Sequence, residues 1–337
     1  PMGIAPWGVI EEDAEADDAI LNIDVPSRVL AKMGVSPDFS CEATGAPVAL
    51  RYIHKRLGET DVYFVANPEP RDVEARCTFR VSGKQPELWW PDSGRTEMAT
   101  TFTSKGDATS LPLRLEPNGS VFVMFRKASD DQRPAAMGKN WAEFSPLQEL
   151  TGPWELTFPP QWGAPDRVTL DRLTSWSEHR DPGVKYFSGT ATYRTRFDRP
   201  ADSRIADRTG RLFLDLGKVA VMAEVKLNGK DLGILWKAPF RVDISEAVQP
   251  GDNALEVRVV NLWINRMIGD EQLPEDSDRR PNGTLNAWPA WLDEGKPSPA
   301  GRFTFTSWRL WKKTDPLVES GLLGPVTLQV AERAPAK

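Results

Sequence analysis

The sequence predicts an all-β protein made of two antiparallel β-sandwich modules. Short runs of alternating apolar and polar residues recur along the chain, and each would bury one face of a strand and expose the other. Turn-forming residues separate these runs at intervals typical of a sandwich. The 29 proline and 25 glycine residues among 337 also fit a loop-rich β protein better than a helical one.

The clearest strand signals lie between residues 186 and 270. The alternating runs of this stretch are 186–197, 211–217, 223–233, 239–244 and 255–259. Asn228 and Gly229 interrupt the third run, and both accept the positive φ angles that a tight hairpin turn requires. Pro250 and Gly251 give a second turn signal. Regularly spaced strands of this kind predict an antiparallel sandwich or jelly roll.

Further strand runs come earlier in the chain and define a smaller β-sandwich module at residues 41–127. Its last run, 120–125, is apolar on both faces of the expected strand. This predicts either a central strand or a strand that the neighbouring domain covers.

The expected domain organisation has four parts. Residues 1–40 form the residual tail of a preceding domain, with a short helix at about 25–34. Residues 41–127 form the small sandwich, and the polar residues 128–150 form a linker. Residues 151–332 form the second and larger module, the jelly roll.

The composition argues against nucleic-acid and membrane partners. The 42 Lys and Arg residues against 48 Asp and Glu give a net charge of −6, and no basic cluster is present that could bind phosphates. No run approaches the roughly 20 apolar residues that span a bilayer. No signal peptide is visible, but the chain begins at Pro1 in mid-pattern, so we expect a fragment.

Cysteine and histidine provide no recognisable reactive or metal-binding motif. Cys41 and Cys77 lack metal-ligand spacing, so two buried or half-buried thiols are expected, with a disulfide as the alternative. His54 and His179 are each isolated, and no Gly-x-Ser-x-Gly motif accompanies them. No His-x-x-x-His pair is present for zinc. The sequence therefore predicts no metal site of this kind and no nucleophilic triad.

Two sets of motifs carry a family resemblance. The runs between residues 186 and 261 resemble the galactose-binding-like jelly roll, the sugar-binding module that is appended to many glycoside hydrolases. The motifs further along the chain are 265–274, 288–292, 301–308 and 320–326. They are similar to the C-terminal part of the α-L-rhamnosidase family, glycoside hydrolase family 106. The whole similarity extends from about Val29 to Val330.

This resemblance implies a non-catalytic C-terminal portion of a glycoside hydrolase. In the family, a catalytic barrel carries the two carboxyl groups that act across one glycosidic bond, and this chain does not contain that barrel. The resemblance further implies that the chain braces the barrel of the same protein, binds glycan, and comes from a secreted or periplasmic parent. One alternative is a stand-alone, lectin-like carbohydrate-binding module. Another is a bracing domain without a ligand.

One acidic loop could mimic a pair of glycosidase carboxylates. It contains Asp270, Glu271, Glu275, Asp276 and Asp278. We expect a solvated loop, no catalytic residues and no cofactor. Calcium coordination is the alternative, although no loop spacing specific to calcium is present.

Tryptophan is the remaining functional signal, because the chain contains 13 such residues. Sugar rings stack their C–H faces on indoles, while neighbouring Arg, Asn or Asp side chains bind the hydroxyl groups. The alternative for any single indole is a place in the core or at the adjoining domain, as expected for Trp89, Trp154 and Trp176. The candidate carbohydrate-binding residues are Trp236, Arg241, Trp263, Asn265, Arg266, Trp288 and Trp291.

Overall fold

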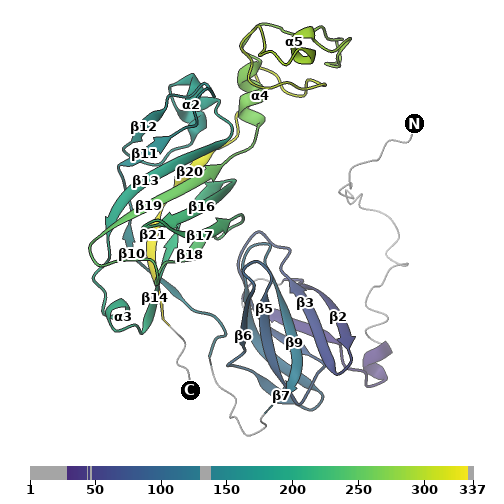
Figure 1. The fold of residues 1–337 in the computed structure, drawn as a ribbon. Helices are drawn as coiled ribbons and strands as arrows, with labels where there is room; N and C mark the ends of the chain where they lie inside the picture. The colour runs from purple at the N-terminus through teal and green to yellow at the C-terminus, as the bar shows by residue number, and fades with distance from the viewer. Residues whose placement is uncertain (1–28, 44, 46–47, 130–137, 333–337) are drawn as a thin grey trace. The chain divides into compact units, whose positions relative to one another are not determined.

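A computed structural model describes residues 29–43, 45, 48–129 and 138–332 of the chain (Figure 1). The fold is all-β, as the alternating sequence pattern predicts, and the named strands pair in antiparallel sheets. The chain divides into two compact units, with the boundary between Asn140 and Trp141. Most of the predicted tail, residues 1–28, lies outside the described residues.

The first unit is a β-sandwich. Among its described residues, one sheet has the strand order β1-β4-β8-β7 and the other has the order β2-β3-β9-β5-β6. The strand bounds are β1 (Phe39–Ala43), β2 (Arg51–Leu57), β3 (Thr60–Ala66), β4 (Val73–Phe79), β5 (Lys84–Trp90), β6 (Arg95–Met98), β7 (Thr103–Lys105), β8 (Ala108–Leu115) and β9 (Ser120–Ala128).

Alternate residues of both sheets fill the core of the first unit. Leu111 and Leu113 of β8 and Val121 and Val123 of β9 are buried together there. Strand β9 lies between β3 and β5, which confirms the prediction of a central strand. Its intervening residues, such as Phe122, face the outer side of the sheet and are only half-buried.

The start of β1 falls inside the segment that was predicted to be a tail. Phe39 pairs with Phe79 of β4, so this part of the chain completes a sheet. His54 lies in the middle of β2, and its two ring nitrogens are 3.1 Å from Asp38 and 3.3 Å from Asp61. The histidine therefore links the segment before β1 to strand β3.

The two cysteines face each other across β1 and β4. Cys41 is the register partner of Cys77, and both thiols are free, which confirms the expectation of two unbridged cysteines. Cys77 is buried, and burial raises the pKa of its thiol well above the usual value. The neutral thiol of Cys77 is thus a small apolar core group.

The second unit is the jelly-roll sandwich. Among its described residues, one sheet has the order β10-β21-β14-β18, a second has the order β12-β11-β13-β19-β16-β17, and β15 pairs with β20. The strand bounds are β10 (Phe144–Glu149), β11 (Trp154–Thr157), β12 (Arg167–Leu170), β13 (Thr190–Asp198), β14 (Gly210–Asp215), β15 (Lys218–Ala220), β16 (Met222–Leu227), β17 (Lys230–Leu235), β18 (Arg241–Asp243), β19 (Asp252–Val260), β20 (Gly321–Gly324) and β21 (Thr327–Glu332).

Strand β10 lies within the segment predicted as a linker. It pairs with β21 at the edge of its sheet, and most of its side chains are exposed or half-buried. An edge strand of this kind has little apolar alternation in its sequence. The polar composition that favoured a linker is therefore also compatible with a strand once a partner is present.

The predicted Asn-Gly hairpin is confirmed. Leu227 and Lys230 are paired across the turn, and Asn228 and Gly229 have φ angles of 54° and 81°. The Asn228 carboxamide also donates 2.9 Å to the Ala247 carbonyl. Local turn chemistry and a tertiary hydrogen bond thus stabilise the same loop.

Three of the tryptophans were assigned to the core or to a domain contact. Trp154 and Trp176 are buried in the core of the second unit, which confirms the assignment for both. Trp89 is half-buried on the outer face of β5, and the Arg126 guanidinium lies 5.2 Å from its ring. Trp154 and Trp176 therefore lie in the core, whereas Trp89 does not.

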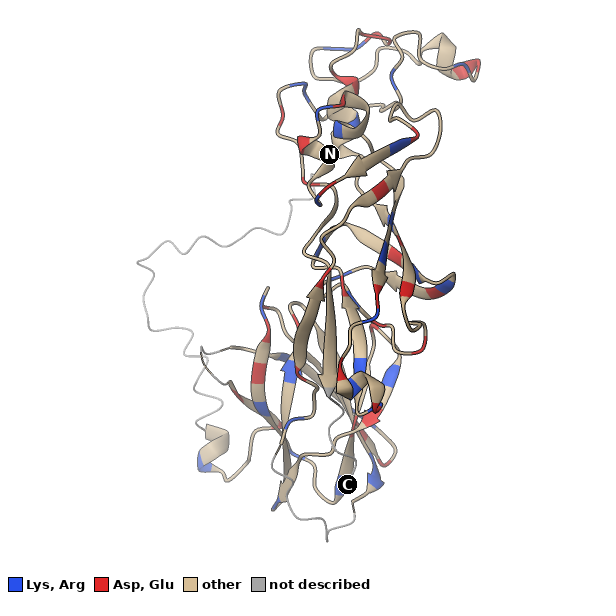
Figure 2. Ribbon diagram, turned by 90° about the vertical axis from the view of Figure 1, so that its left-hand side faces the viewer, with Lys and Arg blue, Asp and Glu red and all other residues tan. Residues whose placement is uncertain are grey.

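Residues 29–32 of the first unit are helical and are the described part of the helix predicted at about 25–34. The other short helices lie at the connections of the second unit. They are η1 (Trp176–Glu178), α2 (Pro182–Lys185), α3 (Ser203–Ala206), α4 (Ile264–Asp270) and α5 (Ala290–Asp293). No helix in the described ranges is both long and apolar enough to cross a membrane. Acidic and basic residues are interspersed along the described strands (Figure 2).

The segment 264–318, here called the excursion, leaves the sandwich after β19 and returns before β20. It contains α4 and α5 and otherwise consists of loops. Asn265 closes its base, because its side chain donates 2.8 Å to the Val318 carbonyl and accepts 2.9 Å from the Val318 amide. Both ends of the excursion are therefore fixed to each other beside the sheets.

Candidate functional site

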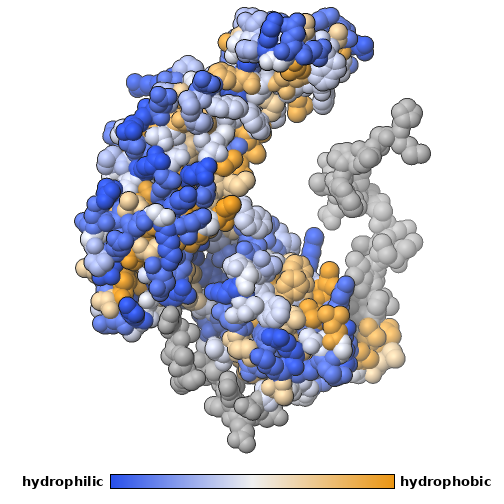
Figure 3. Space-filling view, in the orientation of Figure 1, coloured by the Kyte–Doolittle hydropathy of each residue, from blue (hydrophilic) through white to orange (hydrophobic). Residues whose placement is uncertain are grey.

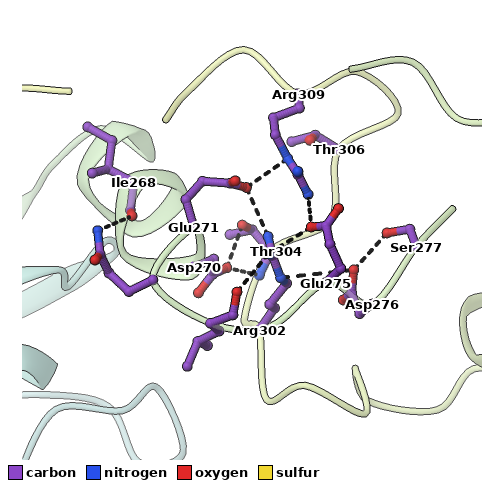
Figure 4. Close-up of polar contacts among 12 residues, drawn as sticks. Ile268, Asp270, Glu271, Glu275, Asp276, Ser277, Arg302, Thr304, Thr306 and Arg309 are labelled. Carbon is purple, nitrogen blue, oxygen red and sulfur yellow. Dashed lines mark hydrogen bonds and ion pairs between the residues drawn. The ribbon is translucent and has the colours of Figure 1, made fainter. Parts of the chain in front are cut away.

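The acidic loop is an ordered ion-pair network within the excursion (Figure 4). Two arginines, Arg302 and Arg309, lie among the carboxylates that follow α4. The carboxylates come from residues 270–276, about 30 residues earlier in the chain. The expectation of a solvated loop is wrong for most of these groups, because arginine rather than water neutralises them.

Arg302 is the centre of the network. Its side chain is only 7% exposed. It donates 2.9 Å to Glu271, 3.1 Å to Glu275, and 2.9 and 3.0 Å to the carbonyls of Pro274 and Leu273. A planar guanidinium with five N–H donors is suited to this arrangement. Arg302 thus fixes the backbone turn after α4 as well as its charges.

Arg309 completes the neutralisation from the other side. Its Nε lies 3.1 Å from Glu271, and its Nη2 donates to Glu275. The hydrogen bond from Arg309 holds the pKa of Glu275 below its usual value. The carboxyl group of Glu275 is therefore ionised at neutral pH and is not poised to donate a proton.

Asp270 occupies a separate buried position at the end of α4. Its Oδ2 accepts 3.0 and 2.7 Å from the amides of Phe303 and Thr304, and 2.7 Å from the Thr304 hydroxyl. The guanidinium of Arg266 lies 4.0 Å from its other oxygen. Asp270 therefore attaches the loop around residue 303 to α4.

The network does not provide two carboxylates facing each other across a cleft. Each of Glu271, Glu275 and Asp276 contacts a side-chain partner inside the excursion. Within the described residues, no group of three or more His, Cys, Asp or Glu side chains is placed to hold a metal ion. Calcium binding, expected only as an alternative, stays an untested prediction.

Three of the predicted carbohydrate-binding residues have structural contacts instead. Arg241 donates 2.9 Å to Asp215 and covers the ring of Phe144 at 3.9 Å. Asn265 is fully buried at the base of the excursion. Arg266 is buried, and burial lowers the pKa of its guanidinium. A sugar could not reach Asn265 without displacing Val318.

The four predicted tryptophans lie in three separate places. Trp236 follows β17 and is exposed. Trp288 and Trp291 both contact Phe305 in the excursion, at ring distances of 5.6 and 5.8 Å, and Trp291 also donates 2.9 Å to the Asp276 carbonyl. Trp263 lies just before α4. The structure thus does not bring the predicted set together.

Trp263 has a partner that sequence reasoning missed. The ring of Trp162 lies 5.7 Å from the ring of Trp263, at an interplanar angle of 51°. Both line a groove of about 500 Å³ on the second unit, together with Arg258 and several hydroxyl side chains. Trp162 is 101 residues before Trp263, in a loop rich in Pro and Gly. The only local signal that could have identified Trp162 as a groove residue was an aromatic side chain in such a loop.

Comparisons with family models indicate the class of protein that this chain is similar to. Both units contain segments that match glycoside hydrolase family models. Residues 7–104 match the α-L-rhamnosidase model, and residues 178–288 match the galactose-binding-like domain of glycosyl hydrolase family 2. The resemblance to α-L-rhamnosidases and to a galactose-binding-like jelly roll is therefore confirmed. The first match lies upstream of the motifs around residues 265–326 that suggested the family.

Particular relatives agree with this class. A solved rhamnosidase from Novosphingobium sp. PP1Y is 35% identical, with a TM-score of 0.73, over 90% of this chain and 26% of its own. A curated protein of Formosa agariphila, provisionally named a β-glucuronidase, is 47% identical over 54% of this chain and 15% of its own length. The chain thus spans about a quarter of the first of these proteins and less of the second.

Proposed function

We propose that this chain is the non-catalytic β-sandwich portion of a glycoside hydrolase similar to the α-L-rhamnosidases. In this role it braces the catalytic barrel of the same protein and binds glycan. The resemblance to a solved rhamnosidase over 90% of the chain supports the choice of parent. The ion-paired state of Glu271 and Glu275 supports the absence of catalytic carboxylates.

The observation that carries the bracing role is an apolar outer face on the five-stranded sheet of the first unit. Ile53, Phe64, Phe122 and Trp89 are successive register partners across β2, β3, β9 and β5. Ile53 is 59% exposed, and the other three are half-buried. Figure 3 shows hydrophobic side chains gathered over β2 and β3.

This face is better suited to a protein surface than to a sugar. Sheet faces in contact with water usually carry polar side chains, and an extended apolar patch marks an interaction site. The rings of Phe64 and Phe122 lie 4.9 Å apart, so the patch is continuous across neighbouring strands. We propose that the catalytic barrel covers it in the intact protein.

The bracing role is tested by one substitution in two contexts. Ile53→Asp should lower the melting temperature and activity of the intact enzyme, because the new charge is buried against the barrel. The same change should leave the melting temperature of this chain alone nearly unchanged. Thr103→Asp, on the exposed edge strand β7 of the other sheet, is the matched control. Equal effects of Ile53→Asp in both contexts would contradict the proposal.

The non-catalytic role is tested on the chain by itself. We expect no turnover of an aryl α-L-rhamnoside above the buffer rate. If turnover appeared and Glu271→Gln or Asp270→Asn abolished it without unfolding the chain, the excursion would contain a catalytic site. The proposed division of labour would then be wrong.

A further inference from the structure

The groove beside Trp162 and Trp263 lies on the outer face of the six-stranded sheet. Its floor is formed by alternate residues of β11, β13 and β19 whose neighbours in sequence point into the core. The lining residues that matter for recognition are Thr157, Trp162, Thr190, Thr192, Arg258 and Trp263. The volume of about 500 Å³ is in the range of small-molecule sites.

The two indoles form an aromatic wall at one end of this groove. Trp263 is 50% exposed although its ring contacts that of Trp162, so much of its surface is available to a ligand. Trp162 also packs against the core of the second unit. A tilted indole pair with a buried back and an open front is a surface on which a flat apolar ring face can stack.

Polar groups form a row across the floor. Thr157, Thr192, Arg258 and Glu224 are successive register partners on β11, β13, β19 and β16. The hydroxyls of Thr190 and Thr192 have no hydrogen-bond partner among the described residues. Arg258 donates to Glu224 through Nη1, which leaves other N–H donors of the guanidinium available.

The backbone beneath the two indoles is fixed by buried polar contacts. The Arg266 guanidinium donates 3.3 Å to the carbonyl of Trp162. The Ser188 hydroxyl donates 2.8 Å to the Leu262 carbonyl, directly before Trp263, and accepts 3.3 Å from the Arg266 amide. Arg266 is therefore a positioning residue. A site held in this way loses little conformational entropy when a ligand binds.

We propose that this groove binds one neutral pyranose residue of a glycan, with a C–H face of the sugar on Trp263 and Trp162. The ring hydroxyls accept from Arg258 and exchange hydrogen bonds with Thr190 and Thr192. Glu224 offsets the charge of Arg258, so an anionic sugar gains no advantage. The inference rests on the proposed glycan-binding function, and it adds the location, the contacting residues and the charge preference.

The test is a titration of the 337-residue chain with a panel of methyl glycosides, followed by tryptophan fluorescence and ligand-observed NMR. The panel contains the α-L-rhamnoside, β-D-glucoside, β-D-galactoside and β-D-glucuronide. We expect saturable binding of at least one neutral member, and no tighter binding of the glucuronide. Trp263→Ala and Trp162→Ala should each raise the dissociation constant at least about tenfold, since stacking on an aromatic wall is lost.

Two further variants keep the test decisive. Trp308→Ala removes an indole of similar exposure, 55%, outside the groove, and should leave binding unchanged. Thr192→Val replaces a floor hydroxyl without loss of volume and should raise the dissociation constant about three- to tenfold, even if Trp162→Ala fails to fold.

The outcomes distinguish the claim that the chain binds glycan from the claim that the groove is the binding site. If the parent chain binds and the Trp263, Trp162 and Thr192 variants bind equally well, the groove is not the site, although glycan binding stands. If no panel member binds saturably, both the groove and the glycan-binding function are overturned.

Discussion

Replacing Arg302 by methionine is expected to open the excursion while the sandwich stays folded. The change keeps most of the side-chain volume but removes a cation whose side chain is only 7% exposed. Glu271 and the carbonyls of Pro274 and Leu273 then lose a donor. Removing one partner of a buried ion pair costs about 3–5 kcal/mol, which is enough to unfold a segment that consists largely of loops.

Hydrogen exchange of amides in residues 271–309 measures this opening directly. The matched control is Lys296→Met, because Lys296 pairs with Glu294 in the same segment but is 68% exposed. Exposed pairs contribute about 0–1 kcal/mol, so exchange in the control should stay close to that of the parent. If both variants exchanged alike, the network would not be what stabilises the excursion.

Gly321→Ala is expected to destabilise the second unit far more than Gly233→Ala, although the two glycines have nearly the same φ angle. Gly321 has φ +96°, and an added Cβ would lie 2.6 Å from both Trp176 Nε1 and Tyr193 Oη. Trp176 donates to the Tyr193 hydroxyl, which also accepts 3.0 Å from the Leu322 amide. The methyl group would therefore displace a buried hydrogen-bonded pair of large side chains.

Gly233 provides the comparison that separates backbone strain from crowding. Its φ is +93°, but nothing lies within 4 Å of an added Cβ. Gly233→Ala should cost about 1–2 kcal/mol of backbone strain. Gly321→Ala should cost about 1–3 kcal/mol more through overpacking. Urea unfolding followed by tryptophan fluorescence measures the difference, and equal unfolding free energies would show that the core around Trp176 can move aside.

Local sequence patterns predicted the elements whose stability is local. The Asn228-Gly229 hairpin and the central strand β9 follow from turn chemistry and from alternation over a few residues. The edge strands β1 and β10 were not recognised, because both are short, neither contains a fully buried residue, and each depends on a partner far along the chain. By contrast, the edge strands β17 and β18 fall largely within the predicted runs 223–233 and 239–244.

The candidate site was harder to predict, because its residues meet only in the folded chain. Arg241 and Asn265 have the chemistry of sugar ligands, but burial and ion pairing use them for the fold. Trp263 was recognised, whereas its partners Trp162 and Arg258 lie on other elements. Neither residue type nor spacing along the chain distinguishes an indole in a groove from one in the core.

The closure of the excursion at its base has a consequence for protein engineering. Asn265 ties the outgoing chain to Val318, and Gln272 repeats this further out by donating 2.9 Å to the Lys313 carbonyl. The ends of the intervening segment are thus held together by bonds that do not depend on what the segment contains. A foreign peptide grafted between residues 272 and 313 would start and finish at fixed points once Asp270 and Glu271, whose partners Thr304 and Arg302 are removed with the segment, are replaced as well. The sandwich could then serve as a scaffold for displaying it.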